Sequence, residues 1–349
     1  MNTLLKRMGF IRILVPIVVL AAISACGQNV EPAPLPVEEA PATDEMIVEA
    51  PIAEEPTPSP TESPPMPVYL MPAEPPEPEM TLQDIDGSLR AYEQRALSGD
   101  RVLDNLYERP FTPYEMEYLP DVDIQIATIA SDDDFFYFSI QLNDLDPAEN
   151  ALTGAYGIEF DRGKKGRGDL LVWVSSLTAE WSFDGLTVYE DKNKDVGGLN
   201  PILANEDHVG DGYETPVNFS QEKAAYARLS PEEPAMVQLA VSRALLDGAE
   251  EFLWGAWADR GWQDPGRFDY NDFIGPGAAG SSILDSGYYP VKELSKLDNT
   301  CRLPYGFNPV DDIRGMCLSK PVPENGGGKA GCTQICPAGA AAGCTLYCP

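Results

Sequence analysis

Residues 123–142 read DIQIATIASDDDFFYFSIQL, and this stretch decides the fold. In its first part apolar and polar residues alternate, which puts Ile124 and Ile126 on one face of a strand. Three consecutive aspartates at 132–134 form a turn signal, and the aromatic and β-branched run at 135–142 has the composition of a returning strand. The stretch therefore predicts an antiparallel β-hairpin.

Short strand patterns continue along the chain on the C-terminal side of this hairpin. Alternating or apolar runs separated by turn residues occur at 155–160, 169–175, 186–190, 236–242 and 252–258. Before the hairpin, residues 81–106 read as partly helical. About seven strands with little helix predict an all-β protein, an antiparallel β-sandwich, which we place at residues 81–297.

The first 25 residues have the organisation of a secretory signal. Basic residues Lys6, Arg7 and Arg12 precede or open an apolar run, ILVPIVVLAAI at 13–23, that is too short to span a bilayer comfortably. We therefore predict that residues 1–25 are a signal peptide.

The residues that follow this apolar run are Ile23-Ser24-Ala25-Cys26. They resemble the bacterial lipobox, in which the cysteine is lipidated and becomes the new N-terminus. The resemblance implies that Cys26 carries acyl chains such as palmitate and anchors the protein outside the cytoplasm, at the cell membrane or the outer surface of the envelope. Ordinary cleavage near Ala25, or an uncleaved anchor, is the alternative.

Residues 26–80 join this anchor to the sandwich. The segment is rich in proline and glutamate and contains no Lys or Arg, so it cannot support a packed core, and we predict a disordered, extended spacer. The whole chain has a formal charge of −32. Such a charge repels nucleic acid, which we exclude as a partner.

Four runs of the predicted sandwich carry a further resemblance. They are 118–142, GAYGIEFDRGKKGRGDLLVWV at 154–174, VQLAVSRALL at 237–246 and FLWGAWAD at 252–259. Together they resemble the family-nine-like carbohydrate-binding modules and the related DOMON-type sandwiches. Those families bind sugars, haem or no known ligand, so the resemblance implies the fold and leaves the ligand open.

One loop has the residue types of a calcium site. Asp191, Asn193 and Asp195 alternate along a segment that follows a predicted strand, and oxygen ligands in this spacing can converge on one hard cation. Val196 and Ile202 stand where a complete EF-hand loop has glycine and glutamate. Calcium is therefore the candidate cofactor here, with an Asx-rich turn as the alternative.

Trp254 and Trp257 are the candidate ligand-binding aromatics. Their odd separation puts them on opposite faces of one strand, so one is expected in the core and the other outward or under a loop. An outward tryptophan would offer a sugar-stacking platform, whereas core packing is the alternative.

The chain lacks the usual catalytic motifs. His208 is its one histidine, which excludes multi-histidine zinc sites and most histidine-based triads. A carboxylate pair could serve a glycosidase, but with 56 acidic residues some pair always looks suitable. We therefore predict a protein without catalytic activity.

Six cysteines gather at the C-terminal end, namely Cys301, Cys317, Cys332, Cys336, Cys344 and Cys348. An even number outside the cytoplasm predicts three disulfides, with a metal site as the alternative. Spacing favours Cys301–Cys317 as one bridge, with the other four paired among themselves. We expect residues 298–349 to form a separate Cys-rich module that the sandwich does not need.

These features predict a surface-anchored lipoprotein. It is held at the membrane by its lipid, and its non-catalytic sandwich binds an extracellular ligand, carbohydrate or protein, with calcium as the candidate ion. A structural or adhesion protein of the envelope without a small ligand is the alternative, and a secreted hydrolase is the second alternative.

Overall fold

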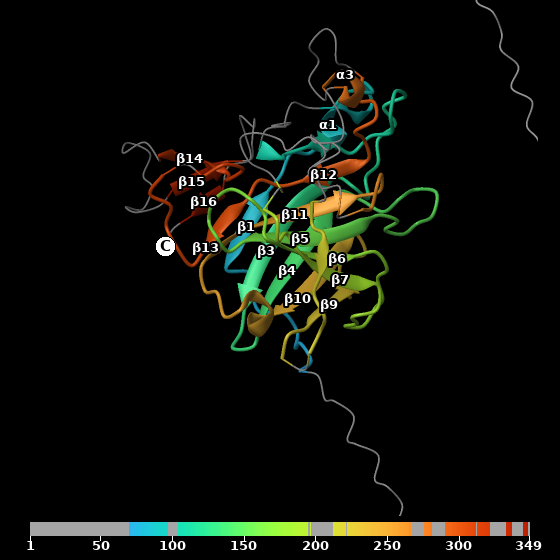
Figure 1. Cartoon of the computed structure of the whole chain (residues 1–349). Coiled ribbons are helices and arrows are strands. Elements are labelled where there is room, and N and C mark those ends of the chain that lie inside the picture. Colours follow the sequence, from blue (N-terminus) through green and yellow to red (C-terminus); the bar gives the residue numbers. More distant parts are fainter. Residues whose placement is uncertain are drawn as a thin grey trace, which may run out of the picture. The chain divides into compact units, whose positions relative to one another are not determined.

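The computed structural model describes residues 70–96, 104–194, 196, 212–220, 222–264, 266, 276–280, 290–311, 313–321, 333–336 and 345–347. All of them belong to one compact unit, Pro64–Pro349. The described part consists mainly of antiparallel strands, which confirms the predicted fold class (Figure 1). Its helices are short: α1 (Ser88–Ala91), the 3-10 helix η2 (Arg243–Leu246) and α3 (Pro276–Ala279). No described helix has the length and apolar character needed to cross a membrane.

The first sheet contains the hairpin predicted at 123–142. Its strands, in spatial order, are β1 (Met80–Gln83), β3 (Ile124–Ser131), β4 (Phe135–Leu142), β10 (Met236–Ser242) and β9 (Ala225–Leu229). All its neighbouring strands are antiparallel, with β4 at the centre.

The second sheet carries most of the remaining strands. In spatial order they are β2 (Glu108–Arg109), β12 (Leu297–Asn299), β11 (Phe252–Asp259), β5 (Ala155–Asp161), β6 (Leu170–Val174), β7 (Leu186–Glu190) and β8 (Thr215–Pro216). Strand β13 (Leu303–Tyr305) also pairs with β11. A small third sheet has the order β14 (Leu318–Pro321), β15 (Thr333–Cys336) and β16 (Thr345–Tyr347).

The main core lies between the first two sheets. Phe138 of β4 packs against Phe160 of β5 and Trp254 of β11, with ring centroids 5.4 Å apart in both pairs. Every residue of β5 and β11 is buried, because other segments of the chain also cover the outer face of the second sheet. A strand covered on both faces reads as a nearly continuous apolar run, which is how these two appear in the sequence.

A bulge changes the predicted facing of the first strand. The pairing of β3 with β4 shifts between Ile124 and Ile126. Ile124 is fully buried, Ile126 is half-buried, and Ala127 and Ile129 take the core positions instead. The prediction that Ile124 and Ile126 share one face is therefore wrong. The extra residue in the bulge moves the side chains after it to the opposite face of the strand.

Both predicted boundaries of the sandwich also move. Residues 70–79, which we assigned to the spacer, are placed against the sandwich, and β1 begins at Met80. At the other end β12 and β13 pair with β11. Cys301 and Cys317 form the predicted disulfide and lie buried in the main core. The sandwich thus extends to Cys317 at least, and the boundary at residue 297 is corrected.

Several predicted features fall outside the described residues. They are the signal peptide, the lipidated Cys26, the spacer up to residue 69, and Cys332, Cys344 and Cys348. Cys336 lies in β15, where the backbone alone is described. The remaining disulfides stay predictions.

Candidate functional site

The predicted calcium loop follows β7. One carboxylate oxygen of Asp191 accepts a hydrogen bond from the backbone N–H of Lys194 at 2.6 Å, and the other accepts one from that of Val196 at 3.2 Å. These contacts are those of an Asx-type turn. Asp195 lies outside the described residues, so the structure does not assemble the set Asp191, Asn193 and Asp195, and this site stays a prediction.

The two candidate tryptophans lie on opposite faces of β11, as predicted, and both are covered. Trp254 is 0% exposed in the main core, and Trp257 is 1% exposed in a second cluster with Tyr107 and Leu297. Segments of chain close over the outer face of the second sheet at this point. Neither ring therefore offers an open stacking platform to a ligand.

Three carboxylates lie close together elsewhere in the fold. No sequence motif predicted this group. Asp84, Glu108 and Asp298 each offer an oxygen, and these three atoms lie within 4.8 Å of one another. Asp84 directly follows β1, Glu108 belongs to β2, and Asp298 belongs to β12. We call these three residues the carboxylate cluster.

The edges of the two sheets bring the cluster together. Glu108 and Asp298 lie directly opposite each other in the β2–β12 register. The backbone N–H of Asp84 donates to the carbonyl of Gln125 at 3.0 Å, and Asp298 Oδ2 accepts from the backbone N–H of Ile124 at 2.7 Å. The cluster thus joins β1 and β3 of one sheet to β2 and β12 of the other.

Burial makes this arrangement costly for bare carboxylates. Asp298 is 0% exposed and Glu108 is 3% exposed, and like charges directly opposite on paired strands are destabilising. Burial, together with the nearby charges of Asp84 and Asp123, raises the pKa of Asp298 well above its ordinary value. Burial likewise raises the pKa of Asp84. A cation in the cluster would oppose both shifts, because a nearby positive charge favours the ionised form of a carboxyl group.

Among the described residues, Asp84 Oδ2 and Asp298 Oδ1 of the cluster are buried without a hydrogen-bond donor. Buried oxygens without a partner are rare and call for an explanation such as a bound ion or water. A cavity of about 10 Å³ adjoins two residues of the cluster, Asp84 and Glu108, and its lining also includes Asn299 and Cys301. A space of this size holds one water molecule or one ion.

The donor set suits calcium. Calcium takes carboxylate oxygens at 2.3–2.6 Å in variable geometry, so two ligands on opposite sides of the ion are about 4.8 Å apart. The three cluster oxygens meet that limit. All-oxygen ligands favour a hard cation over a transition metal.

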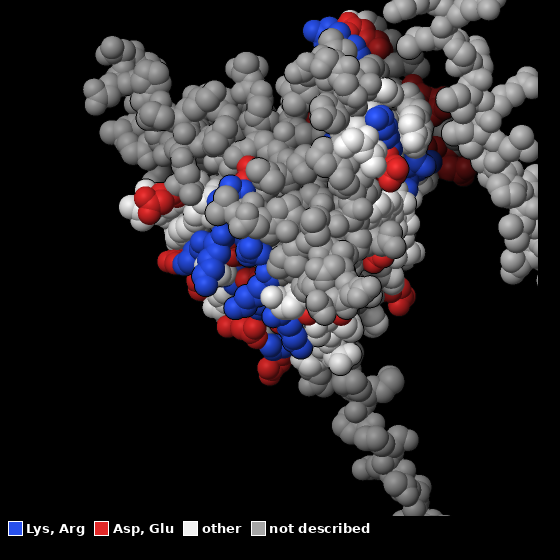
Figure 2. Space-filling view, turned by 45° about the horizontal axis from the view of Figure 1, so that its top comes forward, with Lys and Arg blue, Asp and Glu red and all other residues white. Residues whose placement is uncertain are grey.

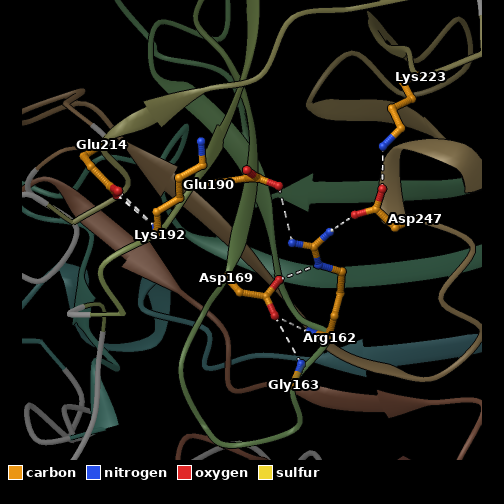
Figure 3. A network of polar contacts seen from close by, with 8 residues as sticks. All are labelled: Arg162, Gly163, Asp169, Glu190, Lys192, Glu214, Lys223 and Asp247. Atoms are coloured by element: carbon orange, nitrogen blue, oxygen red, sulfur yellow. Dashed lines mark hydrogen bonds and ion pairs between the residues drawn. The ribbon is translucent and has the colours of Figure 1, made fainter.

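A second charged region lies on the described surface. Figure 2 shows a group of Lys and Arg side chains gathered on one side. Figure 3 shows a network of polar contacts in which Arg162 reaches Asp169 at 2.7 Å, Asp247 at 3.0 Å and Glu190 at 3.7 Å. Lys223 also pairs with Asp247. Because these basic side chains form ion pairs with carboxylates, the network links segments of the protein and is not a free anion site.

Comparisons of the chain with protein-family models, with curated proteins and with solved structures gave no match. The likeness to family-nine-like and DOMON-type sandwiches therefore stays a resemblance of sequence pattern. The site is interpreted from its own residues.

Proposed function

We propose that this chain is a lipid-anchored extracytoplasmic protein whose sandwich holds a calcium ion and binds an extracellular ligand without catalysing a reaction. The observation that carries the calcium is the carboxylate cluster, in which Asp84 Oδ2 and Asp298 Oδ1 are buried and lack a donor among the described residues. Asp298 Oδ1, Asp84 Oδ2 and the Glu108 carboxylate would hold the ion.

The ion would act on the stability of the fold. It would join the edges of two sheets that otherwise meet as buried like charges. A ligand that binds only the folded state stabilises it by RT ln(1 + [L]/Kd), or about 2.7 kcal/mol at a hundredfold excess over Kd. Calcium in the extracytoplasmic space would therefore favour the folded sandwich.

Thermal unfolding of the full chain in EDTA and in millimolar calcium tests this proposal. We expect calcium to raise the midpoint by about 5–10 °C at a hundredfold excess over Kd. Asp298→Asn should remove that response, since the amide keeps an oxygen for Ile124 but loses the charge, and Asp84→Asn should weaken it. Asp191→Asn is the matched control and should leave the response intact. An unchanged midpoint in the wild-type chain would contradict the proposal, and a response lost in Asp191→Asn alone would move the ion to that loop.

The class of ligand has two candidates. The resemblance to carbohydrate-binding modules favours a sugar, whereas the burial of Trp254 and Trp257 favours the alternative of a structural or adhesion protein. A glycan array probed with the full chain, with and without calcium, separates the two. Selective binding of one glycan class supports carbohydrate recognition, and no binding under both conditions favours the structural role.

A further inference from the structure

The outer face of the first sheet carries a second set of aromatic side chains, away from the main core. Phe135, Tyr137 and Tyr226 are buried there, and Trp181 packs against them. In the strand register Ala240 lies between Tyr137 on β4 and Tyr226 on β9. Two tyrosine rings thus flank a short side chain. We call these five residues the aromatic face.

The end of the proline-rich spacer lies on this face. The Tyr226 hydroxyl donates to the carbonyl of Leu70 at 2.9 Å, and the Trp181 indole N–H donates to the carbonyl of Ala73 at 3.2 Å. The backbone N–H of Ala73 donates in turn to the Tyr137 hydroxyl at 3.1 Å. Pro72, which precedes Ala73, is buried. The aromatic side chains therefore bind backbone polar groups of this segment, on both sides of its buried proline.

An arginine completes the contact with this segment. Arg228 binds both carboxylate oxygens of Glu74, at 3.0 and 2.6 Å. Its Nε donates to Gln238 at 2.8 Å, and its guanidinium lies 4.3 Å from the ring centroid of Trp181. The arginine side chain is 5% exposed, whereas that of Glu74 is 77% exposed. Contacts within the sandwich thus hold Arg228 in place. Its guanidinium binds the Glu74 carboxylate through two parallel hydrogen bonds.

The aromatic side chains, the buried proline and the arginine together suit the recognition of a peptide. Aromatic side chains that donate to carbonyls and cover a proline are the means by which proteins recognise extended, proline-containing peptides. Such peptides lose little entropy on binding, because proline already restricts the chain. The order apolar–Pro–small–Glu occurs at Met71–Glu74 and also at Leu35–Glu38 of the spacer. The face therefore matches a composition that the chain itself repeats.

We propose that the aromatic face, with Arg228, is a binding site for an extended, acidic, proline-containing peptide, and that residues 70–74 occupy it in cis. The carboxylate cluster plays no part in this site, and the calcium proposal does not depend on it. The bound segment fixes the place where the spacer leaves the sandwich. Because a tethered peptide acts at an effective concentration on the order of millimolar, it blocks the face against free peptides of the same kind.

Titration with a fluorescent peptide of residues 68–77 tests the proposal. The full chain with Pro72→Gly and Glu74→Gln should release its own segment and bind the peptide about tenfold more tightly than the wild type does. The control, Pro76→Gly with Glu77→Gln, changes exposed positions of the same segment and should behave as the wild type. A peptide with glutamine in place of its Glu74 should bind the released chain about tenfold more weakly.

Hydrogen exchange in the unaltered chain gives a second measurement that needs no variant to fold. The Ala73 amide should be protected, because it donates to Tyr137. Equal binding of the peptide by all three chains would overturn the proposal. So would exchange of the Ala73 amide at the rate of an unstructured peptide. Retention of the calcium response in the same samples keeps this outcome separate from the fate of the carboxylate cluster.

Discussion

Buried and half-buried aspartates of this protein differ in how their oxygens are used. Asp132 accepts the backbone N–H groups of Asp134 and Phe135 at 2.8 and 2.7 Å, and its second oxygen accepts from the Tyr137 hydroxyl. These bonds lower its pKa in spite of the opposing effect of burial. Asp298 instead keeps one oxygen without a donor among the described residues, and its pKa is raised. The number of donors around a carboxylate, and not its sequence neighbours, thus separates a turn from a candidate cation ligand.

The side chain of Glu74 leads to a prediction on how the docking of the spacer end depends on pH. The hydrogen bonds from Arg228 lower the pKa of Glu74 below its ordinary value of 4.5. A carboxylate whose pKa falls on docking stabilises the docked state above the free pKa, and this contribution is lost as the pH falls through the lowered value. We therefore expect the spacer end to leave the aromatic face in acid.

The indole N–H resonance of Trp181, which donates to Ala73, reports this release. Its shift should change with pH below about 4.5 in the wild type. In Glu74→Gln the segment should be held more weakly at neutral pH, and the step in acid should disappear. A step of the same size and midpoint in both chains would assign the titration to another group.

At the scale of elements, the strands after residue 296 extend the second sheet. Both β12 and β13 pair with β11, each with a different part of that strand. Between them the backbone N–H of Thr300 donates to the carbonyl of Ala256 at 3.0 Å. Cys301 and Cys317, which follow, are 3% and 2% exposed. This segment is an integral part of the second sheet and not an appended module.

The disulfide should therefore support the main unfolding transition. Cys301→Ala with Cys317→Ala removes a bridge between residues 16 apart in sequence, and closing a loop of that length contributes about 3 kcal/mol in the chain-entropy model. We expect the midpoint of the full chain to fall by about 6–12 °C in calorimetry. Alanine at the four cysteines beyond residue 330 is the control and should leave the midpoint nearly unchanged. If the double variant unfolds at the midpoint of the wild type, Cys301 belongs to a separate tail that the sandwich does not need.

Seven strands were predictable from the sequence because their residue types show a strand pattern. Those from Ile124 to Glu190 and the pair β10 and β11 follow alternation or continuous apolar runs. Ala225–Leu229 was missed, since it contains no β-branched residue, and Leu297–Asn299 was missed because two of its three residues are polar. Such short segments become strands through their neighbours, and local propensity does not decide them.

The candidate site was less predictable than the fold. Asp84 falls in a stretch that reads as partly helical, and Glu108 and Asp298 are 190 residues apart in the chain. Only the pairing of β2 with β12 puts them opposite each other. The local pattern at Asp191, by contrast, is visible in the sequence, and its described contacts are those of a turn. A site formed by residues far apart in the chain has no local sequence spacing from which it could be predicted.

At the scale of the whole molecule, several of the few basic side chains lie inside the protein. Arg302 is 1% exposed and pairs with Glu159 at 2.7 Å, and Arg109 is 1% exposed and donates to the carbonyls of Ala279 and Leu294 at 2.8 Å. Positive charge that is buried and paired in this way contributes little to the field around the molecule. The strongly acidic chain should consequently repel anionic surfaces, so the membrane attachment that we propose would need a covalent anchor.

That anchor gives the last prediction, which concerns Cys26. Only Ser24 and Ala25 separate the cysteine from the apolar run of the predicted signal, and several acyl chains together hold a protein at a bilayer where one chain gives only marginal binding. Cys26→Ser should release the protein into the medium or leave the unprocessed precursor. Membrane fractionation and the intact mass of the mature chain measure both outcomes. Cys332→Ser is the matched control, because it removes a different cysteine and should leave the protein in the membrane fraction. If Cys26→Ser fractionates with the membrane and keeps the wild-type mature mass, apart from the substituted atom, the lipid is not at this residue.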